Sequence, residues 1–143
     1  MTVASFADQE LITAYFDGQL AQPVYDDGYP EPADMTWVNG VLTPYVVIEY
    51  GQPVGVADGR SISVEQDQPT IQRVAVSCVA SSGKVAREIA SKVATVGVGF
   101  VASANVGPLR LVGGGNFTQR VESRPLVYVA EVYFTYLSNM ALA

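Results

Sequence analysis

The chain has 143 residues, which fits one domain that buries about 70% of its unfolded surface around a single core. Hydrophobic residues make up 49% of it and charged residues only 15%, and this low charged fraction predicts apolar surface that is buried against other subunits. The net charge of −6 disfavours binding to nucleic acid, which needs a basic patch, and no apolar run is long enough for a membrane span. We therefore expect one soluble domain over residues 1–143, made in the cytoplasm.

Two features of the composition exclude several kinds of chemistry. There is no histidine, which excludes Ser-His-Asp and Cys-His catalysis and histidine-based zinc sites. The single cysteine, Cys78, excludes a disulfide within the chain and a cysteine-cluster metal site, and its apolar neighbours predict a buried core position. We expect no cofactor, no bound metal and no enzymatic activity.

The first predicted element is a helix over residues 7–17, which Gly18 can end. Its apolar residues recur at helical spacing: Leu11, Ile12, Tyr15 and Phe16. Residues 22–43 are rich in proline and turn signals, including Asn39-Gly40, and predict an ordered connection with little regular structure, anchored by Trp37.

A β-branched and aromatic run then predicts a strand over Tyr45–Tyr50. Residues 52–68 predict a polar arm or hairpin. Ile71–Ala80 alternates with a period of two and predicts a central, mostly buried strand. A helix follows over about residues 85–96, with Ser82 among the candidate capping residues and with glycines at its end.

The last predicted elements are a short strand over Pro108–Val112 and a long strand over residues 124–137. One face of the long strand is wholly apolar, and we expect helices to cover it. The other face is amphipathic and could meet a neighbouring subunit. The predicted fold class is α+β, with a mostly antiparallel β-sheet packed by two helices and with long loops or a β-hairpin arm.

Three consecutive glycines, Gly113–Gly115, invite comparison with a phosphate-binding loop. That loop requires a lysine and a serine or threonine directly after the last glycine, whereas Asn116-Phe117-Thr118 follow here. A dinucleotide-binding fingerprint would open a helix, but this segment leads towards a strand. The glycines therefore predict a bulged or mobile hairpin connection.

Clusters of carboxylates are the remaining candidates for chemistry. They could in principle form a glycosidase-type pair or a hard-metal site. They lie in turn-rich segments, where aspartate commonly bonds to its own backbone, so we favour solvated turn residues. The densest groups are Asp26 and Asp27 with Asp34, and Asp58 with Glu65 and Asp67.

Several segments, taken in order, resemble the tail terminator proteins of long-tailed bacteriophages, especially those that infect actinobacteria. An N-terminal helix is followed by similar segments along nearly the whole chain. These are "VYD" at 24–26 with Pro30, "TPYVVIEYGQPV" at 43–54, "VAVSCVA…ARE…KV" within 74–93, "GF" at 99–100 and "RPLVYVAEVYFTYLSNM" at 124–140. The family has no catalytic residues.

The resemblance implies a structural virion protein at the head-proximal end of the tail. There the chain is expected to form a ring with copies of itself, commonly a hexamer, that stops polymerisation of the major tail tube protein and binds a head-completion or connector protein. DNA would pass through this ring without specific binding, and no membrane would be involved.

The expected contact residues fall into two groups. Subunit packing is assigned to one segment of the long C-terminal strand, namely Tyr128, Glu131, Tyr133, Thr135 and Leu137. Contacts with the tube or connector are assigned to protruding connections, which can reach partners that a sheet cannot. These residues are Val56, Asp58, Arg60, Ile62, Val64, Gly114, Asn116 and Phe117.

Two other functions stay open from the sequence. The chain could be a stopper or head-completion protein at the head-tail connector, which also forms rings. It could instead be a small hydrolase that uses carboxylates, in which case a monomer with converging Asp and Glu side chains in a deep pocket is expected.

Overall fold

The computed structural model of the chain describes residues 2–28, 30, 37–39, 41–51, 54–55, 70–104, 106–114, 119–121 and 127–138. The elements of the first half are α1 (Thr2–Gln19), β1 (Val24–Tyr25), β2 (Trp37–Val38), β3 (Val41–Leu42), β4 (Tyr45–Tyr50) and β5 (Val54–Gly55). Those of the second half are β6 (Thr70–Ala80), α2 (Gly83–Gly97), β7 (Arg110–Gly114), β8 (Gln119–Val121) and β9 (Val127–Ser138).

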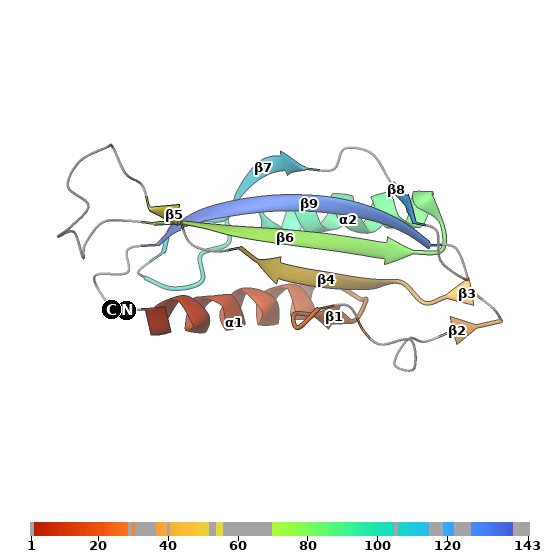
Figure 1. Ribbon diagram of the computed structural model, residues 1–143, viewed down its shortest axis with the longest axis horizontal. Helices are drawn as coiled ribbons and strands as arrows, with labels where there is room; N and C mark the ends of the chain where they lie inside the picture. The colour runs from red at the N-terminus through yellow and green to blue at the C-terminus, as the bar shows by residue number, and fades with distance from the viewer. Residues whose placement is uncertain are drawn as a thin grey trace.

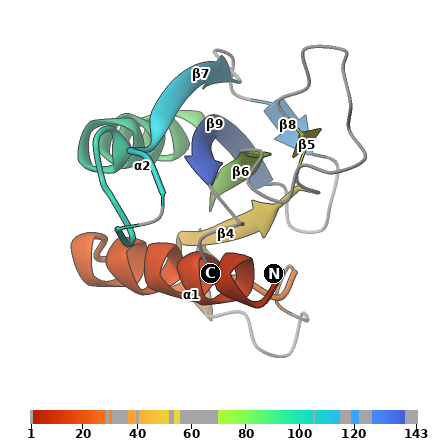
Figure 2. The same cartoon turned by 90° about the vertical axis from the view of Figure 1, so that its left-hand side faces the viewer.

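The main sheet has the strand order β1-β4-β6-β9-β7, with β5 paired to β6 and β8 paired to β9 (Figure 1). All of these pairings are antiparallel except that of β1 with β4. Strands β2 and β3 form a separate hairpin. Both helices lie on the same side of the main sheet (Figure 2). The predicted α+β class, with a mostly antiparallel sheet packed by two helices, is confirmed.

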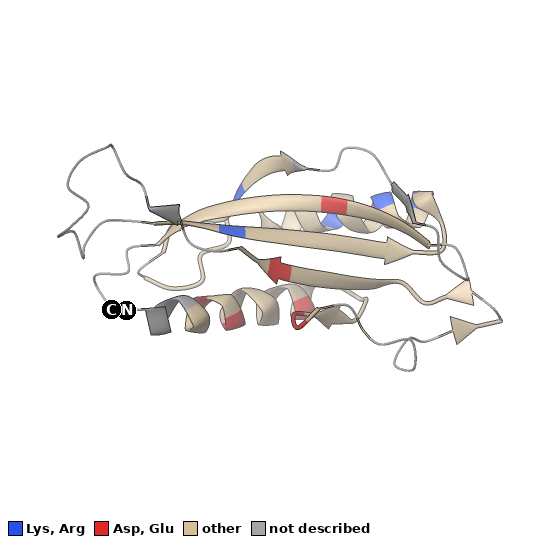
Figure 3. Cartoon of the chain, viewed as in Figure 1, with Lys and Arg blue, Asp and Glu red and all other residues tan. Residues whose placement is uncertain are grey.

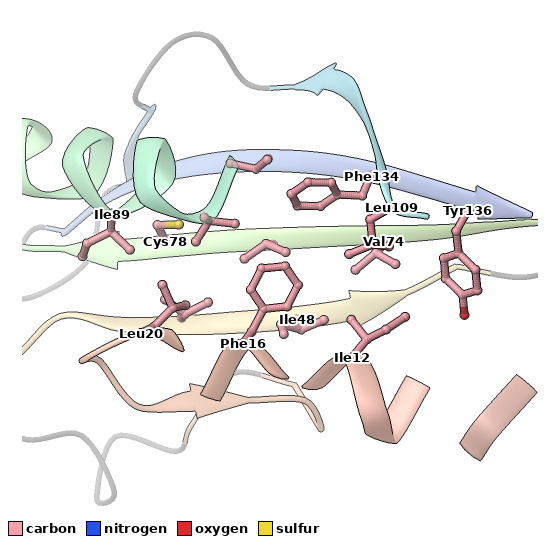
Figure 4. Close-up of a cluster of buried hydrophobic side chains, with 14 of the residues drawn as sticks. Ile12, Phe16, Leu20, Ile48, Val74, Cys78, Ile89, Leu109, Phe134 and Tyr136 are labelled. Carbon is pink, nitrogen blue, oxygen red and sulfur yellow. The ribbon is translucent and has the colours of Figure 1, made fainter. Parts of the chain in front are cut away.

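The main core lies between the sheet and the two helices. Alternation along β4, β6 and β9 sends every second side chain towards the helices, and α1 and α2 supply Phe16 and Ile89 among others (Figure 4). The rings of Phe16 and Phe134 lie 5.9 Å apart between their centroids. Cys78 is fully buried here, as predicted.

Tyr15 joins the two helices at the edge of this core. Its hydroxyl donates a hydrogen bond to the carbonyl oxygen of Val96 at 2.6 Å, and its ring stacks on Phe100 with 3.8 Å between centroids. α1 is therefore fixed to the C-terminal end of α2 as well as to the sheet.

A second, smaller core lies on the opposite face of the sheet, at one end only. Tyr45 and Val47 on β4 and Val79 on β6 pack there with Leu42 of the β2–β3 hairpin. Partly buried Trp37 packs against this cluster, which agrees with its predicted role as an anchor. The rest of that face carries more exposed side chains.

Element bounds follow the predictions most closely in the sheet. β4 covers the predicted residues, and β6 is the central strand that alternation predicted. The helix expected over residues 7–17 is longer, since α1 begins at Thr2 and includes Gly18. The β2–β3 hairpin was not predicted, although Asn39, with φ +52°, sits at the predicted turn.

The strand that leads into the glycines differs from the prediction in its bounds. β7 begins at Arg110, two residues later than expected, and continues through Gly114. The register against β9 shifts between Leu111 and Gly113, and Gly113 has φ +110°, so this segment is bulged, as one of the two predicted forms required. The bulge lies within strand β7, however, and Gly113 and Gly114 belong to that strand and not to a connection. Gly115 to Thr118 lie outside the described residues.

Two helical glycines provide a matched test of this packing. A Cβ at Gly97 would come within 2.6 Å of Phe134 Cζ and 2.9 Å of Phe16 Cζ, whereas a Cβ at Gly18 would meet no atom within 4 Å. We expect Gly97→Ala to lower the free energy of unfolding by about 1–3 kcal/mol, because the core cannot widen freely. Gly18→Ala should raise it by about 0.5–1 kcal/mol through better helix propensity. Urea denaturation measures both, and equal effects would contradict the close packing at Gly97.

Candidate subunit interface

The candidate site is the part of the sheet that neither the helices nor the β2–β3 hairpin packs against. We call it the open face. It arises because the alternation that buries one set of side chains under the helices points the intervening set the other way. Its residues are Glu49 on β4, Arg73 and Ala75 on β6, Arg110 and Val112 on β7, and Glu131, Tyr133, Thr135 and Leu137 on β9.

Strand register arranges the open face in rows that cross the strands. In one row, Thr135 on β9 is flanked by Arg73 on β6 and Arg110 on β7. In the next row, Ala75 lies between Glu49 and Tyr133. Together these rows place one arginine on each side of Thr135, next to a row that contains Ala75 and Tyr133.

A shallow groove of about 470 Å³ runs over these rows. Its lining residues come from β4, β6, β9 and β7, so the groove crosses four strands. The open-face residues in this lining are Glu49, Arg73, Ala75, Val112, Tyr133 and Thr135. Val112 is 59% exposed and Tyr133 is 38% exposed, so a partner that fills the groove would bury apolar and aromatic surface there.

The charges of the open face are only partly neutralised within the subunit. Tyr133 donates a hydrogen bond from its hydroxyl to Glu131 Oε1 at 3.0 Å. Arg73 and Arg110 are exposed, and among the described residues neither guanidinium group forms a hydrogen bond or an ion pair. The two guanidinium groups are therefore available to an acidic partner, which they would bind through charge-assisted hydrogen bonds.

Four of the five residues predicted for subunit packing lie together on this face. Glu131 and Thr135 are half-buried, while Tyr133 and Leu137 are exposed. Tyr128 differs, because it lies on the helix side of the sheet and packs, partly buried, against a cluster of Ala80, Ala86 and Ala130.

Most residues predicted for partner contacts lie outside the described part of the chain: Val56, Asp58, Arg60, Ile62, Val64, Asn116 and Phe117. Gly114 was expected in a connection and is instead the last residue of β7, where it pairs with Val132. Sequence reasoning did not select Arg73, Arg110, Val112 or Glu49. Alternation did place Arg73 opposite the apolar face of its strand, but no sequence signal aligned it with Arg110.

Buried polar groups gather at one end of the main core. The hydroxyl of Tyr50 donates to the carbonyl oxygen of Gln9 at 2.8 Å and lies 2.7 Å from Thr13 Oγ1. Burial raises the pKa of Tyr50 to about 12, although the hydrogen bond with Thr13 opposes this rise. Among the described residues, the buried hydroxyl of Tyr136 has no hydrogen-bond partner, and burial, with Asp8 and Tyr50 nearby, raises its pKa well above the usual range.

These groups do not form a reactive centre. Burial also raises the pKa of the Cys78 thiol to about 12, so this cysteine stays a neutral thiol at physiological pH. Among the described residues, no three acidic or cysteine side chains come together as metal ligands. No helix in the described ranges is both long enough and apolar enough to cross a membrane.

Comparisons with known proteins add little to this geometry. No protein-family model and no curated protein sequence matches the chain. One solved structure is 17% identical in sequence, with a TM-score of 0.47 over 91% of this chain and 94% of its own. That likeness is too slight to inform either the fold or the function.

Tyr50, which is half-buried, and Tyr136, which is buried, should respond in opposite ways to loss of the hydroxyl. Tyr50→Phe should lower the free energy of unfolding by about 1 kcal/mol, because Gln9 and Thr13 lose their partner. Tyr136→Phe should leave it unchanged or raise it by up to about 1 kcal/mol, because its hydroxyl has no partner to lose. Urea denaturation at pH 7 measures both, and a larger loss for Tyr136→Phe would contradict the described contacts.

Tyr50 also affects how the stability of the chain changes at alkaline pH. The pKa of Tyr50 is about 12 in the folded chain and about 10 in the unfolded chain. Between these two pH values the folded chain keeps a proton that the unfolded chain has lost. The stabilisation is complete below about pH 10 and is lost as the pH rises towards 12. Tyr50→Phe should therefore show a smaller alkaline loss of stability than the unchanged chain.

Proposed function

We propose that this chain is a phage tail terminator, a structural virion protein that forms a ring at the head-proximal end of the tail tube. In this role it ends tube polymerisation and joins the tail to head-completion proteins. The ordered sequence resemblance to that family supports the proposal. The structure adds support of a different kind, because it identifies a surface suited to contact between subunits.

The open face is the observation that carries the proposal. Leu137 is 44% exposed and Tyr133 38% exposed, both on a long strand held at the centre of the sheet. A rigid, partly apolar face with unpaired arginines can bury aromatic and aliphatic surface and form charged hydrogen bonds at the same time. Such a surface is better suited to protein assembly than to catalysis.

The acidic composition supports passage of DNA through such a ring. A lumen lined by acidic side chains repels phosphate and does not trap the DNA that slides through it. The exposed acidic residues that the structure describes include Asp26 and Asp27, in the turn after β1. A net charge of −6 per subunit adds up around a ring of identical copies.

Tube growth in vitro tests the proposal. Tube protein purified from the tails of the same virion is allowed to polymerise alone and with a small amount of this chain, and tube lengths are measured by negative-stain microscopy. We expect shorter tubes with a ring of density at one end. The outcome that would sink the proposal is unchanged tube length with no density at either end.

A variant and a competing partner sharpen this experiment. Leu137→Asp should remove both the ring and the capping, while circular dichroism shows an unchanged fold, because the residue is exposed in the subunit. Arg87→Glu, on the exposed side of α2 and away from the open face, serves as a folded control that keeps the open face intact. Binding to DNA-filled heads without binding to tubes would instead favour a connector stopper or head-completion protein.

A further inference from the structure

Acidic and basic residues are strongly segregated along the sequence. Residues 1–59 contain nine acidic residues and no lysine or arginine, whereas residues 60–143 contain all eight basic residues and five acidic ones. The first part forms α1 and β1 to β5, and the second forms β6 to β9 with α2. Figure 3 shows the result in the fold: red positions on α1 and near β1, and blue positions on β6, β7 and α2.

The outer face of α1 is the acidic surface of interest. We define it as the exposed side of this helix, where small residues lie between two acidic ones and two apolar ones. Its residues are Phe6, Ala7, Glu10, Leu11, Ala14, Asp17 and Gly18. Within the described ranges, neither Glu10 nor Asp17 has a hydrogen bond or ion pair from its side chain.

Internal packing of the subunit does not account for this surface. Phe6 is 63% exposed and Leu11 is 47% exposed, although buried positions on the same helix are filled by Ile12 and Phe16. Nothing in the subunit approaches the position of a Cβ at Gly18, so no internal contact requires glycine there. Small residues between larger ones allow a second protein surface to come close to the helix backbone.

The spacing of the acidic pair matches that of the open-face arginines. Glu10 and Asp17 are seven residues apart, which is about 10 Å along an α-helix. Arg73 and Arg110 are in register on the two strands that flank β9, and two strand spacings are also about 10 Å. A helix that crosses the strands can therefore bring one acidic side chain to Arg73, which lines the groove, and the other to Arg110, which lies beside the groove in the same row.

From this match we propose that the outer face of α1 in one copy seats in the groove of the open face of the next copy. Glu10 and Asp17 pair with Arg73 and Arg110, and Leu11 and Phe6 bury apolar surface around Val112 and Tyr133. Glu49, at the β4 end of the groove, repels the acidic residues on the outer face of α1 and so restricts the contact to one register. This inference rests on the proposed ring and names its contact.

The positions of the two surfaces set the symmetry. α1 lies on the helix side of the sheet, and the open face is the opposite side (Figure 2). A contact between two different surfaces of one chain is heterologous, and it closes into a ring when the rotation between copies allows. Each copy then uses both surfaces, once as donor and once as acceptor.

Two charge-reversed variants, measured separately and then mixed, test the contact. One variant carries Arg73→Glu and Arg110→Glu, the other Glu10→Arg and Asp17→Arg, and solution mass is measured by analytical ultracentrifugation at low salt. We expect each variant alone to associate at least about tenfold more weakly than the unchanged chain, because like charges meet. An equimolar mixture should regain the assembled mass, since acidic and basic surfaces then alternate between the two variants.

A third variant controls for net charge. Arg87→Glu and Lys92→Glu reverse an equal number of positive charges on the exposed side of α2, away from the open face, and should leave the mass of the assembly unchanged. Recovery in the mixture also shows that both reversed variants are folded, because a misfolded chain cannot restore assembly.

Several results would overturn the inference. These are an unchanged chain that stays monomeric, reversed variants that assemble normally, or a mixture that fails to recover the assembled mass. The tube assay separates this failure from that of the proposed function. If the reversed variants still shorten tubes, the terminator role stands and this contact is wrong; if exchange restores the mass but tubes grow unchecked, the contact stands and the role is wrong.

Discussion

The pairing of β6 with β9 is the constraint on which the rest of the molecule depends. Eleven residue pairs, from Thr70 with Ser138 to Ala80 with Tyr128, hold these strands together at the centre of the sheet. Because side chains alternate, this single register decides which residues face the helices and which face away. A shift by one residue would place Phe134 in solvent and Thr135 in the core.

The two helices and the small hairpin then cover the sheet unevenly. α1 and α2 cover one face along the main core, while the hairpin covers the other face only around Tyr45 and Val79. The uncovered part keeps a well-defined shape because its backbone belongs to the most extensively paired strands of the sheet. The open face is therefore rigid but not enclosed, and such a surface loses little conformational entropy when a partner binds.

Sequence patterns predicted what depends on local periodicity. Alternation identified β6 and the two faces of β9, and the residues after Gly115 excluded a phosphate loop. The two-residue strands β2 and β3 are too short to show any period, so the hairpin at Asn39 was missed. The row that joins Arg73 to Arg110 depends on a register set by tertiary pairing through Thr135, and one-dimensional patterns carry no such information.

The charge distribution favours one mode of assembly over another. If two open faces met about a two-fold axis, the carboxylates available to Arg73 and Arg110 would be Glu49 and Glu131, and Glu131 already accepts a hydrogen bond from Tyr133. Burying an arginine whose charge is not fully paired is energetically unfavourable. Glu10 and Asp17 on the outer face of α1 would also remain unpaired. The proposed head-to-tail contact would pair both sets of charges at once. If copies of the chain assemble, the sheet that fixes the arginine row therefore favours a repeated, directional contact over a closed pair.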